Sequence, residues 1–123
     1  MAKLIYPDLS YKMVGILFTV YNDLGYGYQE KYYQRAVSEE LKKAKLSYRR
    51  ERKALIKYRD RIIGRYFIDF VIENKIVVEI KVANSFYKKD INQVLGYLKA
   101  TGLKLGILFI FTKCSLKFKR IVN

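Results

Sequence analysis

Hydrophobic residues recur along this chain with two different periods, and the period separates helices from strands. Near the start, Met13, Leu17 and Val20 follow helical spacing, and Ser10 is a candidate N-cap residue. Further along, apolar residues alternate or run continuously, as they do in β-strands. Together these patterns predict helices over residues 10–24, 29–44 and 88–100 and strands over residues 47–58, 61–72, 75–82, 104–111 and 117–122.

This order of elements predicts an α/β fold with a mixed central β-sheet and helices on both of its faces. The segment 104–111 is almost continuously apolar, which is typical of a strand buried on both sides. The 123 residues contain no evident linker or repeat, so we expect one domain over residues 1–123. No signal peptide is visible, and the apolar runs are too short to span a bilayer, which predicts a soluble, cytoplasmic protein.

The charge is strongly basic: 25 Lys and Arg against 11 Asp and Glu give a formal net charge of +14. Such an excess predicts a polyanionic partner, first of all nucleic acid. The densest basic group lies between residues 42 and 57 and includes Arg49 and Arg50. A basic surface without a specific partner is the alternative. An anionic membrane is a weaker candidate, because no amphipathic helix has a strongly basic face, and we expect no membrane partner.

The residues that are missing exclude several kinds of chemistry. The chain has no histidine, which removes mechanisms that need an imidazole base or ligand. Its single cysteine, Cys114, excludes an intrachain disulfide and a cysteine zinc site. Carboxylates and lysines therefore remain as the candidate catalytic groups.

Three charged residues stand inside two apolar strand segments that a short turn joins. If the turn of residues 73–75 is centred on Asn74, Asp69 lies directly opposite Glu79, and Lys81 follows on the same face. Two carboxylates placed so repel each other, and a divalent cation between them is a common reason to keep them. The alternative is an ordinary half-exposed sheet face, on which charged and apolar residues also alternate.

Magnesium held by such a pair would suit phosphodiester hydrolysis, because it activates water and neutralises the scissile phosphate. Asp69 and Glu79 would supply part of its shell, and the carbonyl of Ile80 a further oxygen. The ammonium of Lys81 would orient the attacking water or stabilise the charge that develops on the phosphate.

Further motifs extend this set into a family pattern. The segment Gly27-Tyr28-Gln29-Glu30-Lys31-Tyr32-Tyr33 matches Gly-x-x-Glu-x-x-Tyr, and the elements Asp69, Glu79-x-Lys81 and Gln93-x-x-x-Tyr97 follow in order. Together they closely resemble the GxxExxY family of the PD-(D/E)XK nuclease-like superfamily, over about residues 6–123. The resemblance implies a restriction-endonuclease-like core and a nuclease that uses Mg²⁺ or Mn²⁺.

The resemblance also assigns roles residue by residue. It implies metal-ligand positions for Asp69 and Glu79, the catalytic position for Lys81, a helix glutamate that reaches the metal for Glu30, and a glutamine that orients the site for Gln93. Read without the resemblance, Glu30 is a first-turn glutamate stabilised by the helix dipole, and Gln93 and Tyr97 are a polar rim with a tyrosine at the core edge. The expected nucleic-acid contacts are Tyr97, Lys88, Lys89, Arg49 and Arg50.

Two positions depart from the family pattern. Phe67 stands where many relatives have Arg or another polar residue, and Ile68 replaces the proline of the Pro-Asp pair. Aromatic residues that flank the proposed site, Tyr26, Tyr28 and Tyr32 among them, are candidates for stacking on bases or for the core and its edge.

Two functions therefore remain open at the sequence level. One is a magnesium-dependent nuclease that acts on DNA in preference to RNA. The other is a non-catalytic, basic nucleic-acid-binding module on the same fold. A homodimer, which would present two sites, is also open at this level.

Overall fold

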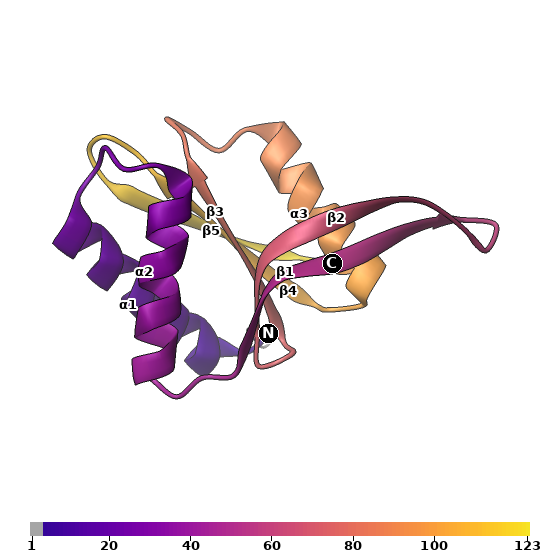
Figure 1. Cartoon of the computed structure of the whole chain (residues 1–123), viewed down its shortest axis with the longest axis horizontal. Coiled ribbons are helices and arrows are strands. Elements are labelled where there is room, and N and C mark those ends of the chain that lie inside the picture. Colours follow the sequence, from indigo (N-terminus) through magenta and orange to yellow (C-terminus); the bar gives the residue numbers. More distant parts are fainter. Residues whose placement is uncertain (1–3) are drawn as a thin grey trace.

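The computed structural model describes residues 4–123 and contains three helices and five strands (Figure 1). In chain order these are α1 (Pro7–Leu24), α2 (Glu30–Lys43), β1 (Tyr48–Tyr58), β2 (Arg61–Ile72), β3 (Ile76–Val82), α3 (Lys88–Thr101), β4 (Leu105–Phe111) and β5 (Leu116–Val122). The predicted order of helices and strands is confirmed, and their ends agree with the prediction to within three residues.

The strands form one sheet in the order β1-β2-β3-β4-β5. All neighbours are antiparallel except β3 and β4, which are parallel and connected through α3. A parallel pair needs a long crossover connection, which α3 supplies. Every residue of β4 is buried, as its continuous apolar run predicted.

Helices cover both faces of the sheet. On one face α1 and α2 contribute Met13, Leu17, Tyr33 and Leu41 to a core with the sheet, and on the other α3 packs Val94 and Leu98 against it. This is the arrangement that the sequence predicted, a mixed sheet between two helical layers.

Helix α1 begins earlier than predicted. It starts at Pro7, three residues before the candidate cap Ser10, which lies within the helix and is buried. Tyr6 occupies the N-cap position in a left-handed conformation without a side-chain cap bond, and Pro7 opens the helix. Proline fits here because its φ suits the first turn and no N–H is needed there. No helix among residues 4–123 is both long and apolar enough to cross a membrane.

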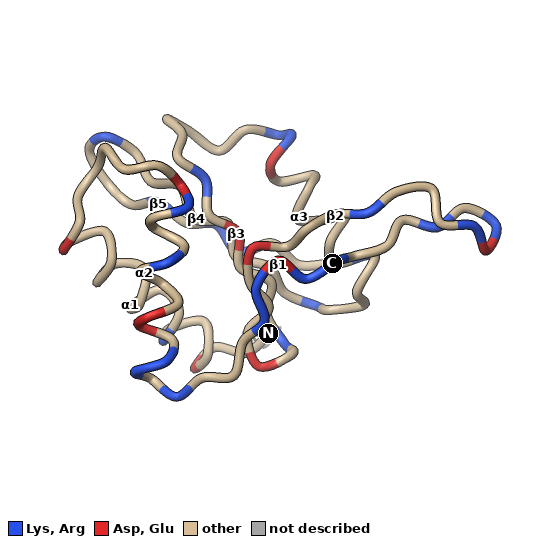
Figure 2. Tube along the Cα trace, in the orientation of Figure 1, with Lys and Arg blue, Asp and Glu red and all other residues tan. Residues whose placement is uncertain are grey.

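Strand β2 lies in the sheet at one end and in a protruding two-stranded hairpin at the other. Its inner end pairs with β3 in only three rows, Ile72–Ile76, Val71–Val77 and Phe70–Val78, whereas β1 accompanies it along its whole length. The outer parts of β1 and β2 consequently leave the sheet as a two-stranded arm (Figure 1). Basic residues occur along this arm (Figure 2): Arg52, Lys53, Lys57, Arg59, Arg61 and Arg65.

The strand twists where the arm begins. Phe70 packs into the core under α1 and α2, whereas Ile68, two residues earlier, packs into the core under α3. Residues two apart share a face in a regular strand, so the alternation is broken at Asp69 between them. Its side chain is thereby turned toward the neighbouring strand β3.

Candidate active site at the fork between two strands

Asp69 and Glu79 lie where β2 and β3 separate, and their carboxylates take over the hydrogen bonding of the two strands. The N–H of Asp69 donates to Oε1 of Glu79 over 3.0 Å, and the N–H of Ile80 donates to Oδ2 of Asp69 over 2.9 Å. These bonds continue the register of the two strands, in which Asp69 lies opposite Glu79 as predicted. A backbone N–H left unpaired by the fork would cost free energy, and the carboxylates satisfy two of them.

The second oxygen of Glu79 faces Lys81 and Tyr97. The ammonium Nζ of Lys81 lies 3.8 Å from Oε2 of Glu79, and the hydroxyl of Tyr97 lies 3.5 Å from the same oxygen. The Glu79 residue is only 2% exposed, whereas a quarter of the Lys81 side chain is exposed. Lys81 therefore connects the buried carboxylate to the surface of the molecule.

Helix α2 brings a third carboxylate to the fork. Glu30 is the first residue of α2, and its carboxylate lies close enough to the backbone of Val82, at the end of β3, for that backbone to lower its pKa. The charge of Asp69 is close enough to affect its ionisation. The predicted approach of Glu30 to the hairpin residues is therefore present in the structure.

One further residue at the site, Gln34, was missed by sequence reasoning. Gln34 lies close enough to the carboxylate of Asp69 to lower its pKa, and its Oε1 accepts a bond of 2.9 Å from Arg50. The guanidinium of Arg50 also lies over the ring of Phe70, 5.0 Å from its centre. Gln34 follows Glu30 by four residues and so shares its helix face, which was the available signal.

The carboxylates resist ionisation together. Burial is the largest cause that raises the pKa of all three; the charge of Asp69 raises the pKa values of Glu30 and Glu79 further, and Lys81 lowers those of all three. The pKa of Glu79 reaches about 8, and the charge of Arg50 acts to lower the pKa of Asp69. Burial and the Glu79 charge also raise the pKa of Tyr97, which keeps its hydroxyl a hydrogen-bond donor.

This donor set fits a hard divalent cation. Carboxylate oxygens are the ligands such ions prefer, and a positive charge would relieve the mutual repulsion that raises these pKa values. Among residues 4–123 no three acidic, histidine or cysteine side chains are already grouped around one point. Asp69 and Glu79 would supply part of the shell of such an ion.

The other predicted residues lie at different depths. Gln93 lines a cavity of about 490 Å³ together with Lys81 and Tyr66. Arg49, Lys88 and Lys89 are exposed, whereas Arg50 is half-buried and held by Gln34.

Tyr97, which we expected to contact nucleic acid, is buried in this structure. Its residue is only 1% exposed, and its hydroxyl points to the Phe67 carbonyl and Glu79. The helical spacing predicted that Tyr97 and Gln93 share a face of α3. It did not show that the part of α3 around Tyr97 packs against the sheet.

The comparisons with known proteins agree with this architecture. The SSO0001 crystal structure is 19% identical with a TM-score of 0.62; the similarity covers 96% of this chain and 60% of that one. An alkaline exonuclease (LHK-Exo) from Laribacter hongkongensis is 12% identical with a TM-score of 0.56, covering 100% of this chain and 72% of that one. The chain thus spans three fifths of the length of SSO0001. None of the curated protein sequences compared with it matches.

These likenesses establish the restriction-endonuclease-like fold that the sequence predicted. The sequence pattern of a family described as the PD-(D/E)XK nuclease superfamily matches residues 7–121, which include the fork, α3 and nearly all of the sheet. The chain therefore belongs to the PD-(D/E)XK nuclease superfamily.

Proposed function

We propose that the chain is a nuclease that depends on Mg²⁺ or Mn²⁺, is of the GxxExxY type, and works as one domain over residues 1–123. The observation that carries the proposal is the pair of buried carboxylates at the fork, with the ammonium of Lys81 3.8 Å from one of them. The net charge of +14 supports a nucleic-acid substrate. DNA is the first substrate to test, ahead of RNA.

In this proposal Asp69 and Glu79 hold the ion, with Glu30 and the carbonyl of Ile80 as further oxygen ligands. The ion, when bound, activates water and neutralises charge on the scissile phosphate. The two backbone N–H bonds from Asp69 and Ile80 hold the carboxylates at the fork before the substrate arrives. Such preorganisation lowers the cost of assembling the site for each turnover.

Lys81 acts on the substrate side of this pair. Its side chain lines the cavity that also contains Gln93, so its ammonium is placed to contact a phosphate oxygen there and to stabilise negative charge that develops on it. The amide of Gln93 would orient the phosphate or the attacking water. Tyr97 is a positioning residue, because it reaches the reacting groups only through Glu79.

Exposed basic residues outside the cavity would hold the rest of the substrate. Lys88 and Lys89 begin α3, and Lys89 lines the same cavity as Lys81. Arg49 is exposed on β1. A homodimer, in which two copies present two such sites to one duplex, is compatible with this arrangement and belongs to the proposal.

The direct test is cleavage of plasmid DNA, single-stranded DNA and RNA by the purified chain with Mg²⁺ or Mn²⁺. We expect Asp69→Asn and Lys81→Gln to lower the rate at least about 100-fold, the order of loss when one group that stabilises transition-state charge is removed. The matched controls are Asp60→Asn, at the tip of the arm, and Lys12→Gln, on α1, which are exposed.

The outcomes separate the two functions left open by the sequence. Cleavage lost in both site variants and kept in both controls supports the nuclease. Binding of nucleic acid without cleavage under any of these conditions supports the non-catalytic module instead. Cleavage that survives in Asp69→Asn and Lys81→Gln contradicts the assignment of the site.

A further inference from the structure

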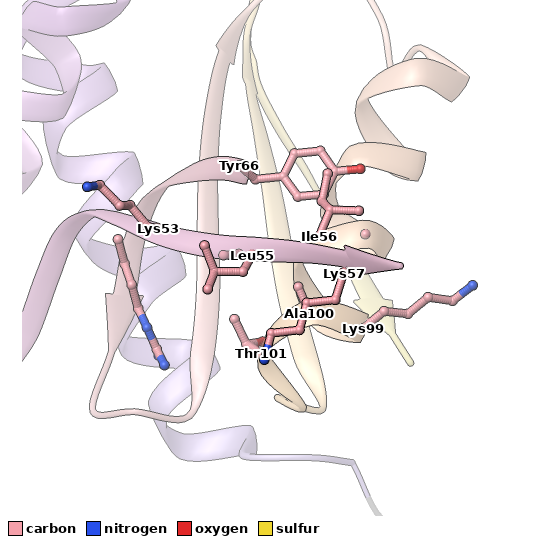
Figure 3. A pocket seen from close by; sticks show the side chains of 11 residues that line it. Lys53, Leu55, Ile56, Lys57, Tyr66, Lys99, Ala100 and Thr101 are labelled. Carbon is pink, nitrogen blue, oxygen red and sulfur yellow. The ribbon is translucent and has the colours of Figure 1, made fainter. Parts of the chain in front are cut away.

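A second, larger cavity lies between β1 and the C-terminal half of α3 (Figure 3). It has a volume of about 630 Å³, within the usual range of about 300–1,000 Å³ for ligand sites. Its apolar lining comes from Leu55, Ile56, Tyr66 and Ala100. In Figure 3 the ring of Tyr66 lies next to Ile56. We call this cavity the β1–α3 groove.

The charged residues of the β1–α3 groove all carry the same sign. Arg52, Lys53, Lys57 and Lys99 line it, and no Asp or Glu does. Within residues 4–123, none of these four has a salt-bridge partner, since the salt bridges present there involve Lys42, Lys43 and Lys81. The groove therefore has the charge that complements a polyanion.

Tyr66 separates the β1–α3 groove from the candidate active site. This residue lines both the β1–α3 groove and the cavity of Lys81 and Gln93. Its ring meets the ring of Tyr97 edge-on, with 5.0 Å between centroids, and Tyr97 in turn reaches Glu79. A polymer whose phosphate lies at the fork would thus have the groove on the other side of Tyr66.

Gly96 allows Tyr66 to take this position. A Cβ at position 96 would lie 3.0 Å from the Tyr66 hydroxyl oxygen and 3.2 Å from two ring carbons, closer than packing normally allows. The glycine lets the Tyr66 ring lie directly against α3, between the two cavities.

We infer that the β1–α3 groove binds a single-stranded segment of nucleic acid next to the phosphate held at the fork. An unpaired base has a free face for the apolar floor and Tyr66, and the flanking cations match its phosphates. In a duplex the base faces are stacked on one another and the floor would stay empty. The inference rests on the proposed function for the position of the scissile phosphate, and it adds the form of the substrate.

The test measures binding without cleavage, in EDTA, by the fluorescence anisotropy of a labelled 12-nucleotide oligothymidylate and of a labelled blunt 12-base-pair duplex. The double variant Lys57→Glu/Lys99→Glu reverses two exposed charges of the groove. We expect it to weaken single-strand binding at least 10-fold and duplex binding less. Loss of two phosphate contacts should also reduce the slope of log K against log salt by about 1.4.

The matched control is Lys12→Glu/Lys45→Glu, with the same change in net charge on α1 and in the turn after α2, both exposed. This control should weaken the binding of the single strand and of the duplex by the same small factor. Equal losses for the two double variants would mean that only overall charge matters and would overturn the inference. If the groove variant loses affinity for the duplex and for the single strand equally, the single-strand assignment is overturned.

A second pair of variants tests the stacking residue and guards against misfolding. Tyr66→Phe keeps the ring and should keep the affinity for single strands, whereas Tyr66→Leu should lower that affinity about 5- to 150-fold, the range for one stacked base. Equal affinity of these two variants counts against the groove. Because all binding is measured without metal, a chain that binds in the groove but never cleaves contradicts only the proposed function. A chain that cleaves, yet binds single strands independently of the groove, contradicts only the inference.

Discussion

At the scale of single residues, the site consists of charges that the fold keeps close despite their repulsion. Asp69 and Glu79 are tolerated because each accepts a backbone N–H at the fork and because Lys81 stands beside Glu79. Arg50 contributes from the neighbouring strand, through Gln34 and through its own charge. These groups together decide how much of the pair is ionised at a given pH.

Arg50 offers a test at this scale, because its charge lowers the pKa of Asp69. Arg50→Met removes that charge, so the pKa of Asp69 should rise and the acid limb of the pH–rate profile should move to higher pH. The neighbouring Arg49→Met is the matched control, because Arg49 is exposed. The check is kcat/KM against pH for both variants. A profile that shifts equally in the two would show that Arg50 has no specific role.

At the scale of elements, the site depends on two strands that separate and on a helix packed closely behind them. The pairing of β2 with β3 stops after three rows, which leaves the fork open, and α3 packs Tyr97 against Glu79 there. Gly106 on β4 allows this close packing: a Cβ there would lie 2.5 Å from Cγ1 of Val94 on α3. The position of α3 therefore depends on a residue outside the site.

Gly106→Ala should destabilise the protein by about 1–3 kcal/mol, the usual cost of overpacking a core. The control is Gly15→Ala in α1, where a Cβ meets nothing within 4 Å. That change should stabilise the helix by about 0.5–1 kcal/mol. Urea unfolding of the two variants measures both effects. A Gly106→Ala variant as stable as the parent would mean that α3 moves away without cost.

At the scale of the whole molecule, the buried carboxylates link stability to pH. The pKa of Glu79 is about 8 in the folded chain against 4.5 as the ordinary value. Below pH 4.5 both states hold the proton; between 4.5 and 8 the unfolded state loses it first. The metal-free fold therefore loses stability as pH rises through this window, by up to about 1.4 kcal/mol per pH unit for one such group.

Without divalent ions, the parent protein should thus unfold at a lower temperature at pH 8 than at pH 5.5, and Glu79→Gln should show a smaller difference. Part of the difference should remain in the variant, because the pKa values of Glu30 and Asp69 are also raised. Glu39→Gln, at an exposed position on α2, should behave as the parent. Thermal unfolding in EDTA at both pH values is the measurement, and identical pH dependence in all three proteins would contradict the prediction.

Local patterns were enough to predict much of this molecule. The two hydrophobic periods predicted every helix and strand in order, and the short turn at Asn74 predicted the register that brings Asp69 opposite Glu79. Both follow from interactions between residues close in the chain. The start of α1 was missed, because the prediction gave more weight to the cap residue Ser10 than to Pro7.

The sequence by itself therefore determined the order of the elements and the pairing of the two carboxylates, since spacing along the chain controls both. Only the tertiary structure decided what surrounds the pair: the twist of β2 at Asp69, the contact of Gln34 with Arg50, the burial of Tyr97 and the groove beside Tyr66. These features join residues from α2, β1, β2 and α3. Their meeting depends on how the twisted sheet and its helices pack, which no local spacing specifies.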